Sequence, residues 1–314
     1  MMKYINLTIC CLLTFFMSAG IANAQNQDNS QRADTTVNPD NIVDTLQSKA
    51  GIIRNEIAIN GSVGISVINY SLVEGGSRSD GSSGISGILG LAYTRNFNEH
   101  FGIVSGIEMT RYGSKASYDV IEGKREYGNG DDRLEFDYSI NGYIEEQSTM
   151  MISIPVMAQY SALLSDQATF YLAGGFKFGL PINAKATIFS KKLSTGGFFF
   201  TENMRYYEDL PERGFTRLEQ PVVNPVDIPM KVSVAASIET GSYFTLIKNV
   251  RLYVGVYLDY GLNNIRSIKG DNMLVGYNTL SPSIFTHKSV LNTSLSDNVR
   301  ILATGLKLKM SFGW

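Results

Sequence analysis

Cysteine is almost absent from this sequence, and the only two, Cys10 and Cys11, lie in its first apolar stretch. We predict that residues 1–24 are a signal peptide, because Lys3 precedes an apolar run and residues 22–24 (Ala-Asn-Ala) form a small-residue cleavage pattern. A membrane anchor is the alternative, but the run is shorter than the ~20 apolar residues of a spanning helix. The mature chain would contain no thiol, which excludes disulfides, zinc–thiolate sites and cysteine nucleophiles.

Long hydrophobic runs and clusters of positive charge are also missing. No run of ~18 apolar residues follows the leader, which excludes transmembrane helices. Lys and Arg number 27 against 29 Asp and Glu, a net charge of −2, without the basic face that nucleic-acid binding requires. Residues 25–50 contain few large apolar side chains and are predicted to form a flexible periplasmic tail, which leaves residues 51–314 as one domain.

What the chain does contain is alternation with a period of two residues. In residues 299–314 one set of alternate positions is bulky and apolar, and the other is small or cationic, a pattern typical of a β-strand. The same pattern predicts seven more strands upstream. The eight predicted strands cover approximately residues 57–67, 85–97, 101–110, 149–160, 169–180, 230–243, 250–261 and 299–314.

The nature of the second face decides between two β architectures. A soluble β-sandwich would show the same alternation, but its outer face would carry mainly Lys, Thr and Glu. Here the second face is mostly Gly, Ala and Ser, as the crowded interior of a small barrel requires. The sequence therefore predicts an all-β protein: an eight-stranded antiparallel up-and-down transmembrane β-barrel in the bacterial outer membrane.

The connections between the predicted strands alternate in length. Long segments, about 69–84, 113–148, 181–229 and 262–298, follow the odd-numbered strands, and short turns follow the even-numbered ones. All four long segments therefore fall on one side of the membrane. Long extracellular loops and short periplasmic turns are the outer-membrane pattern, which predicts a periplasmic N-terminus.

Several strand segments resemble a known family. Residues 91–97 (LAYTRNF), 106–113 (GIEMTRYG), 152–156 (ISIPV) and 260–265 (YGLNNI) are similar to the small outer-membrane β-barrel proteins called PorT-like. The resemblance extends over the strands from Ile57 to Trp314 and implies the fold far more than a role. One type of member is linked to a protein secretion system.

The predicted interior face carries charged residues, which should pair across strands because an isolated charge in so narrow a space costs several kcal/mol. We expect Glu239, Arg251 and Lys309 to lie near one another, and Asp259 to meet Lys231. The main interpretation is a network that seals the barrel; the alternative is a narrow anion path, because the bases outnumber the acids. The predicted lumen charges are Glu108, Lys177, Lys231, Glu239, Arg251, Asp259, Lys307 and Lys309.

Local motifs give three further expectations. Asn141-Gly142 between apolar alternations predicts a type I′ hairpin within the second long loop. Residues 129–132 (NGDD) suggest a calcium turn but lack a full ligand series, so no metal site or cofactor is predicted. Pro155 predicts a bulge in the fourth strand, because proline removes a ladder donor.

The third long loop is rich in aromatic residues, which would either fold inward as a lid, the interpretation we favour, or stand exposed as a partner surface. These residues are Phe198, Phe199, Phe200, Tyr206, Tyr207 and Phe215. At the chain's end, Phe312 and Trp314 are predicted to serve as the insertion signal for the barrel assembly machinery.

Catalysis has little support in the sequence. His100 is predicted to lie in a short turn, and His287 lies in a long loop near Ser283, Ser289 and Asp271, residue types common in any loop. We therefore predict a non-enzymatic structural or interaction protein of the cell envelope. A conduit for small solutes or hydrophobic compounds, and a component of a secretion or envelope-assembly machine, are the alternatives. Expected partners are outer-membrane lipid, lipopolysaccharide, the barrel assembly machinery and an envelope protein.

Overall fold

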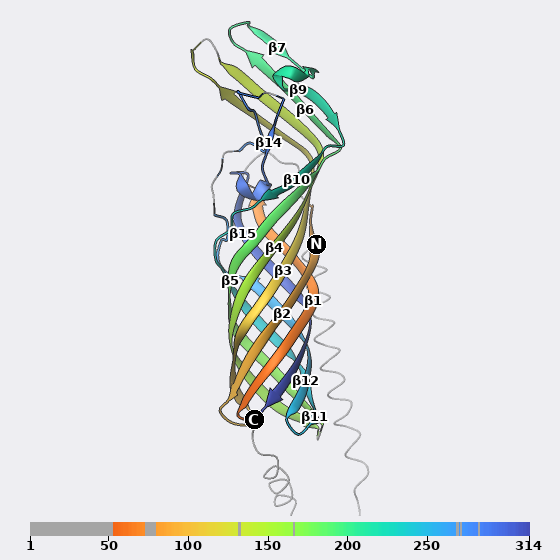
Figure 1. Ribbon diagram of the computed structural model, residues 1–314, viewed down its shortest axis with the longest axis vertical. Coiled ribbons are helices and arrows are strands. Elements are labelled where there is room, and N and C mark those ends of the chain that lie inside the picture. Colours follow the sequence, from red (N-terminus) through yellow and green to blue (C-terminus); the bar gives the residue numbers. More distant parts are fainter. Residues whose placement is uncertain are drawn as a thin grey trace, which may run out of the picture. The chain divides into compact units, whose positions relative to one another are not determined.

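Eight strands form a closed ring in the computed structural model (Figure 1). They are β1 (Asn55–Leu72), β2 (Asp80–Asn96), β3 (Phe101–Tyr127), β4 (Leu134–Ser165), β5 (Ala168–Phe189), β11 (Ser233–Ile247), β12 (Val250–Gly261) and β15 (Ser296–Gly313). Neighbours from β5 through β11, β12, β15, β1, β2 and β3 to β4 run antiparallel, and β4 pairs with β5 to complete the ring. The structure describes residues 53–72, 80–130, 133–165, 167–267, 270, 272–281 and 283–314. The predicted signal peptide and periplasmic tail lie outside these residues.

The two faces of each ring strand differ in exposure. Leu306 and Leu308 are 63% and 56% exposed, whereas Lys307 between them is 4% exposed. The outward apolar residues include Ile57, Ile59, Val63 and Ile65 of β1; Leu89 and Leu91 of β2; Ile107 and Met109 of β3; Ile152, Ile154 and Val156 of β4; Phe176 and Phe178 of β5; Ile238 of β11; Val254 of β12; and Met310 of β15. We call this outer surface the apolar belt.

The apolar belt is not covered by a second layer. Within the described residues, the only other sheet is the two-stranded pair of β13 (Val275–Gly276) and β14 (Thr286–His287). Exposing so many large apolar side chains to water would cost ~25 cal/mol per Å². The soluble sandwich is therefore excluded, and lipid is the solvent that fits this surface. Among the described residues, no helix is long and apolar enough to cross a membrane.

Small residues allow the ring to close between its first and last strands. Gly64 of β1 pairs with Gly305 of β15. A Cβ atom on Gly64 would lie 2.1 Å from the backbone oxygen of Thr304, and one on Gly305 would lie 2.4 Å from that of Val63. The glycines on the small-residue face are thus positions where two backbones approach closely.

Two strands continue well beyond the ring. β3 and β4 contain 27 and 32 residues, whereas ~9–11 residues suffice to cross the apolar core. Beyond the ring, β4 pairs with β6 (Lys192–Phe199), which pairs in turn with β7 (Met204–Tyr206) and β9 (Phe215–Glu219). We call this part, with β8 (Asp209–Leu210) and the 3-10 helix η2 (Pro211–Arg213), the sheet extension, and the end of the ring that carries it the extended end (Figure 1). The opposite end, with the connections 97–100 and 248–249, is the short-turn end.

The sheet extension corrects two expectations about the second long loop. Residues 113–148 are mostly strand, because β3 continues to Tyr127 and β4 begins at Leu134. The predicted hairpin at Asn141-Gly142 is wrong, because both residues lie inside β4. β4 pairs with β6 only as far as Asn141, and Gly142 follows with φ of 61°. The Asn-Gly pair supplies its positive φ where β4 leaves β6, a role that the sequence alone cannot distinguish from a turn.

The predicted bulge at Pro155 is also wrong. Ser105 pairs with Val156 and Glu108 with Ser153, so two residues lie between these pairs on each strand and neither strand has an extra one. Pro155 faces the interior and leaves the register of β4 on β3 unchanged.

The remaining elements lie near the extended end. β10 (Val222–Asp227) pairs with the last residues of β5. The 3-10 helix η3 (Val290–Asn292) precedes β15. We call residues 283–295 the capping segment, because they cover the interior of the ring at the extended end.

Candidate functional site

The interior of the ring contains a buried network of ion pairs. Lys177 lies 2.8 Å from Asp259 and 3.1 Å from Glu108, and Lys307 lies 2.8 Å from Glu108 and also pairs with Glu239. All five side chains are 4% exposed or less. β1 and β2 separate β15 from β3 in the ring, so the Lys307–Glu108 pair crosses the interior.

A second group lies nearer the short-turn end and includes an acid that the sequence analysis missed. Glu56 of β1 is 1% exposed. It pairs with Arg251 and accepts hydrogen bonds from Tyr253 at 2.9 Å and Ser311 at 2.8 Å. Glu56 lies two residues before Ala58 and therefore on the same small-residue face of β1. The two-residue alternation would have predicted that Glu56 points into the interior.

Two expected contacts are wrong. Lys231 is exposed, outside the interior, and precedes β11 with its backbone N–H bonded to Ile265 O at 2.7 Å. Asp259 pairs with Lys177 instead, and Arg251 pairs with Glu56 rather than Glu239.

These corrections change the charge balance of the interior. Among the described residues of the two groups, together with Lys309 beside them, four are acids and four are bases, so the excess of bases that suggested an anion path disappears. The acids are Glu56, Glu108, Glu239 and Asp259, and the bases are Lys177, Arg251, Lys307 and Lys309.

Lys309 is held differently from the other interior bases. It is 4% exposed, and its ammonium group lies 4.0 Å from the ring centre of Tyr253 and 5.6 Å from that of Tyr171. Within the described part of the chain, no carboxylate lies within ion-pair distance of it. Cation–π contacts therefore take the place of an acid partner.

Above the ion pairs, apolar side chains fill the extended half of the interior. They come from most of the ring strands and form one cluster with Leu291 of η3. The members include Ile68, Ile88, Tyr112, Met151, Ala184, Ala186, Tyr257, Val299 and Ile301. These side chains form an apolar layer next to the capping segment.

Glu145 of β4 fixes the capping segment. This side chain is fully buried and accepts hydrogen bonds from Ser289 Oγ at 2.6 Å and from the backbone N–H of Val290 at 3.0 Å. Tyr143 and Gln147 of β4 donate to the same carboxylate. Ser289 is also the N-cap of η3, where its hydroxyl accepts from the Leu291 N–H at 3.1 Å.

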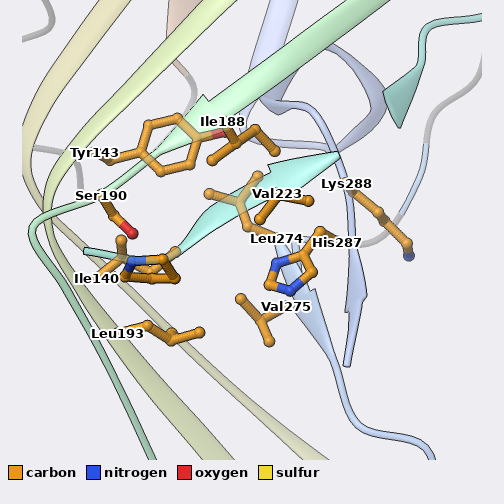
Figure 2. Close-up of a pocket in the computed structure, with 11 residues that line it drawn as sticks. Ile140, Tyr143, Ile188, Ser190, Leu193, Val223, Leu274, Val275, His287 and Lys288 are labelled. Atoms are coloured by element: carbon orange, nitrogen blue, oxygen red, sulfur yellow. The ribbon is translucent and has the colours of Figure 1, made fainter. Parts of the chain in front are cut away.

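Beside the cap lies an apolar pocket. Figure 2 shows Leu274, Val275 and His287 facing Ile188 and the other apolar residues that line it. Burial lowers the pKa of His287. The cavity measures about 10 Å³, enough for about one water molecule, so it is too small for an organic ligand.

The aromatic residues of the third long segment lie in the sheet extension. Phe199 and Tyr206 pack against Phe215, with ring centres 5.8 and 6.3 Å from it, and Phe215 contacts Tyr277. Phe198 of β6 and Phe200, just after β6, contact each other, and Arg133 is 4.2 Å from the Phe200 ring. Tyr207 is 65% exposed. The capping segment, and not these aromatics, covers the interior.

Among the described residues, those considered for catalysis make other contacts. His100 stacks on Tyr160 and bonds to Ser161 O at 3.0 Å. Ser289 is committed to Glu145, and Asp271, like the last two residues of the 129–132 motif, lies outside the described residues. Within the described ranges, no group of three His, Cys, Asp or Glu side chains could hold a metal ion. Phe312 and Trp314, at the end of β15, are 49% and 60% exposed on the outer face.

Comparisons with known proteins found a matching family model and several similar solved structures. The model of the outer membrane protein beta-barrel domain matches residues 23–267. Similar solved structures include Neisserial surface protein A, with 10% identity, a TM-score of 0.32 and coverage of 82% of this chain and 97% of that one. OprG from Pseudomonas aeruginosa has 12% identity, a TM-score of 0.33 and coverage of 83% and 96%, and the protease OmpT from Escherichia coli has 9%, 0.33 and the same coverage. No curated protein matches the sequence. With the family model matching most of its length, the chain belongs to the outer membrane protein beta-barrel domain family, whose place is the bacterial outer membrane.

Proposed function

We propose that this protein is a non-enzymatic structural or interaction component of the cell envelope, and that the sheet extension is its partner surface. The observation that carries the proposal is the filled interior. Within the interior, the ion pairs are followed toward the extended end by an apolar layer and then by the capping segment. An eight-stranded barrel is just wide enough for side chains to fill it.

The filled interior argues against the main alternative, a conduit for solutes or hydrophobic compounds. A path would have to break the Lys307–Glu108 pair and displace Leu291 together with the capping segment. Buried ion pairs are costly to break, because each partner left behind is an uncompensated charge.

The sheet extension offers two features that suit a partner. β2 pairs with β3 only as far as Ser117, while β4 pairs with β3 up to Tyr127. Among the described residues, β3 beyond Ser117 is therefore an edge strand, and such an edge can bind an extended segment of another protein. At the end of β6, Phe198 and Phe200 add partly exposed aromatic surface.

The orientation and the remaining partners belong to the same proposal. The extended end faces the cell exterior and the N-terminus the periplasm, following the outer-membrane pattern of long and short connections. The apolar belt contacts lipid and lipopolysaccharide, and Phe312 and Trp314 present the insertion signal to the barrel assembly machinery. The PorT-like resemblance makes a secretion or envelope-assembly machine one setting in which such a partner would be found.

Partner capture from detergent-solubilised envelopes tests the proposal. We expect the full chain to retain an envelope protein that the double variant Phe198→Ala, Phe200→Ala loses. The matched control is Phe176→Ala, which removes an exposed aromatic from the apolar belt. Heat-modifiable gel migration checks folding of every variant. Equal capture by the double variant would rule out this surface.

Planar-bilayer recordings test the conduit. We expect no conductance steps from the folded chain, and none from the variant Lys307→Gln, Lys309→Gln. Steps in the unaltered protein that this variant abolishes would favour the conduit. Lipase, protease and acyltransferase assays of the protein and of His287→Ala are expected to give the same background; a rate lost in His287→Ala would reinstate an enzyme.

A further inference from the structure

Two ring strands end their outward apolar run with a cation at the extended end, and a third cation lies just before β11. On β15, Arg300 lies on the same outer face as Leu302 and Leu306 and is nearer the extended end than both. On β3, Arg111 is the next outward residue after Met109 toward that end. Before β11, exposed Lys231 adjoins Val232. Each of these cations lies at the rim of the apolar belt, where lipid headgroups begin.

None of these three cations is neutralised within the described part of the chain. Arg300 Nε donates to Asn298 Oδ1 at 3.0 Å, and Arg111 Nε donates to Ser148 Oγ at 3.3 Å; both acceptors are uncharged. The acidic residue nearest Arg300 in sequence, Asp297, is 3.9 Å from Arg266 instead. The rim therefore has positive charge to offer to a ligand.

A groove of about 310 Å³ lies beside Arg300. Asn69, Tyr260, Asn298 and Leu302 line it together with Arg300. At this place the register of β1 on β15 shifts between Asn69 and Ser71, and Asn298 has a positive φ of 54°. Its volume is at the lower limit of ligand pockets, which measure ~300–1,000 Å³.

The chemistry of the groove suits one kind of ligand. The guanidinium group of arginine matches a phosphate with two parallel hydrogen bonds. Tyr260 is 48% exposed and pairs with Leu302 across the strands, so a hydroxyl and an apolar contact lie on the same outer face. The groove is continuous with the apolar belt, so a ligand that binds there has its apolar part in the membrane.

We infer that Arg300 and its groove bind the phosphate group of an anionic lipid in the membrane leaflet at the extended end, with Lys231 and Arg111 contacting further headgroups around the rim. The inference deepens the lipid contact in the proposed function and does not depend on the sheet extension. Failure of partner capture would therefore leave the lipid site unaffected, and failure of lipid binding would leave the proposed partner surface unaffected.

The test measures lipid binding to the folded full chain in neutral detergent by native mass spectrometry. The probe is diphosphoryl lipid A, and its phosphatase-treated form is the comparison. We expect the phosphorylated form to bind about tenfold more tightly, because one charge-assisted hydrogen bond changes the affinity by about this factor. Arg300→Gln should remove this preference, and Arg300→Lys should retain part of it. Tyr260→Phe, which keeps the apolar contact, should weaken binding by a smaller factor and serves if Arg300→Gln fails to fold.

The matched control is Arg95→Gln, an outward cation at the short-turn end that is bonded to Asn55. It should bind the phosphorylated lipid like the unaltered protein. Equal binding by Arg300→Gln, or an equal loss in Arg95→Gln, would overturn the site. Displacement of the lipid by inorganic phosphate at the lipid's own concentration would show a free-anion site instead, and would overturn the lipid assignment.

Discussion

Ser289 donates its hydroxyl to the carboxylate of Glu145 at 2.6 Å, although 144 residues separate them in the chain. This contact joins the capping segment to an interior position of β4. The same carboxylate accepts the backbone N–H of Val290. The closure of the interior at the extended end therefore depends on one buried acid.

Replacing Glu145 with Gln should loosen the cap. The donors on Ser289, Val290 and Tyr143 would lose a charged acceptor, a loss of ~1–3 kcal/mol. We expect faster hydrogen exchange at the amides of Val290 and Leu291. The control is Glu146→Gln, the next residue, whose side chain is 53% exposed and pairs with exposed Lys115; its effect should be within ~1 kcal/mol. Equal exchange in the two variants would contradict this role for Glu145.

Removing Lys307 should destabilise the ring. Lys307→Met would leave Glu108 and Glu239 with one cation fewer, and breaking a buried pair in this way costs ~3–5 kcal/mol. Urea unfolding in lipid vesicles, followed by the fluorescence of Trp314, measures the change. Adding Glu239→Gln should recover part of the loss, because it removes the opposite charge. A single variant as stable as Lys115→Met would show that the network contributes little.

Gly64→Val should prevent the first and last strands from pairing. Its Cβ would lie 2.1 Å from the backbone oxygen of Thr304, a distance that no side-chain movement relieves. We expect loss of the heat-modifiable folded band on gels. Gly174→Ala on β5 is the matched control, because nothing lies within 4 Å of its Cβ position. Normal folding of Gly64→Val would refute the proposed close approach.

Acid should loosen the sheet extension. The hydrogen bond from Lys124 lowers the pKa of Glu135, and Arg205 adds to this effect. A carboxyl group with a lowered folded-state pKa contributes stability that is present above the ordinary pKa of Glu, ~4.3, and is lost as the pH falls through the lower folded value.

Limited proteolysis at the connection between β3 and β4, residues 128–133, would detect that loss. Cleavage should stay constant from about pH 8 to 5 and increase below about pH 4. In Glu135→Gln the increase below about pH 4 should be smaller, because that carboxyl no longer titrates. An acid response of the same size in this variant would assign the effect to other groups.

Part of the fold could be predicted because alternation is a local property. The parity of residues such as Leu306, Lys307 and Leu308 follows from the two-residue repeat of a strand, whatever the rest of the chain does. Predicting eight strands and their up-and-down order therefore required only the pattern and the lengths of the connections, and both predictions are confirmed.

The errors arose where a residue's role depends on a distant partner. Asn141-Gly142 permits a positive φ, but β6, some fifty residues later, decides that it ends a pairing and not a hairpin. Lys231 belongs to the same parity as interior residues, yet it precedes the first residue of β11 and is exposed. Residues 113–148 were predicted to be a loop because they are rich in charged residues. Charged residues are equally common in strands that extend into water, so composition could not separate the two.

Spacing along one chain is enough to specify the class of fold, the faces of the strands and the lipid-facing surface. Which charges meet, which segment closes the ring and where a groove opens beside Arg300 became visible only in the folded structure. Those outcomes depend on the shear and closure of the ring, which bring together residues as distant as Glu108 and Lys307. Contacts across a closed ring are set by all of its strands at once, so no local pattern can encode them.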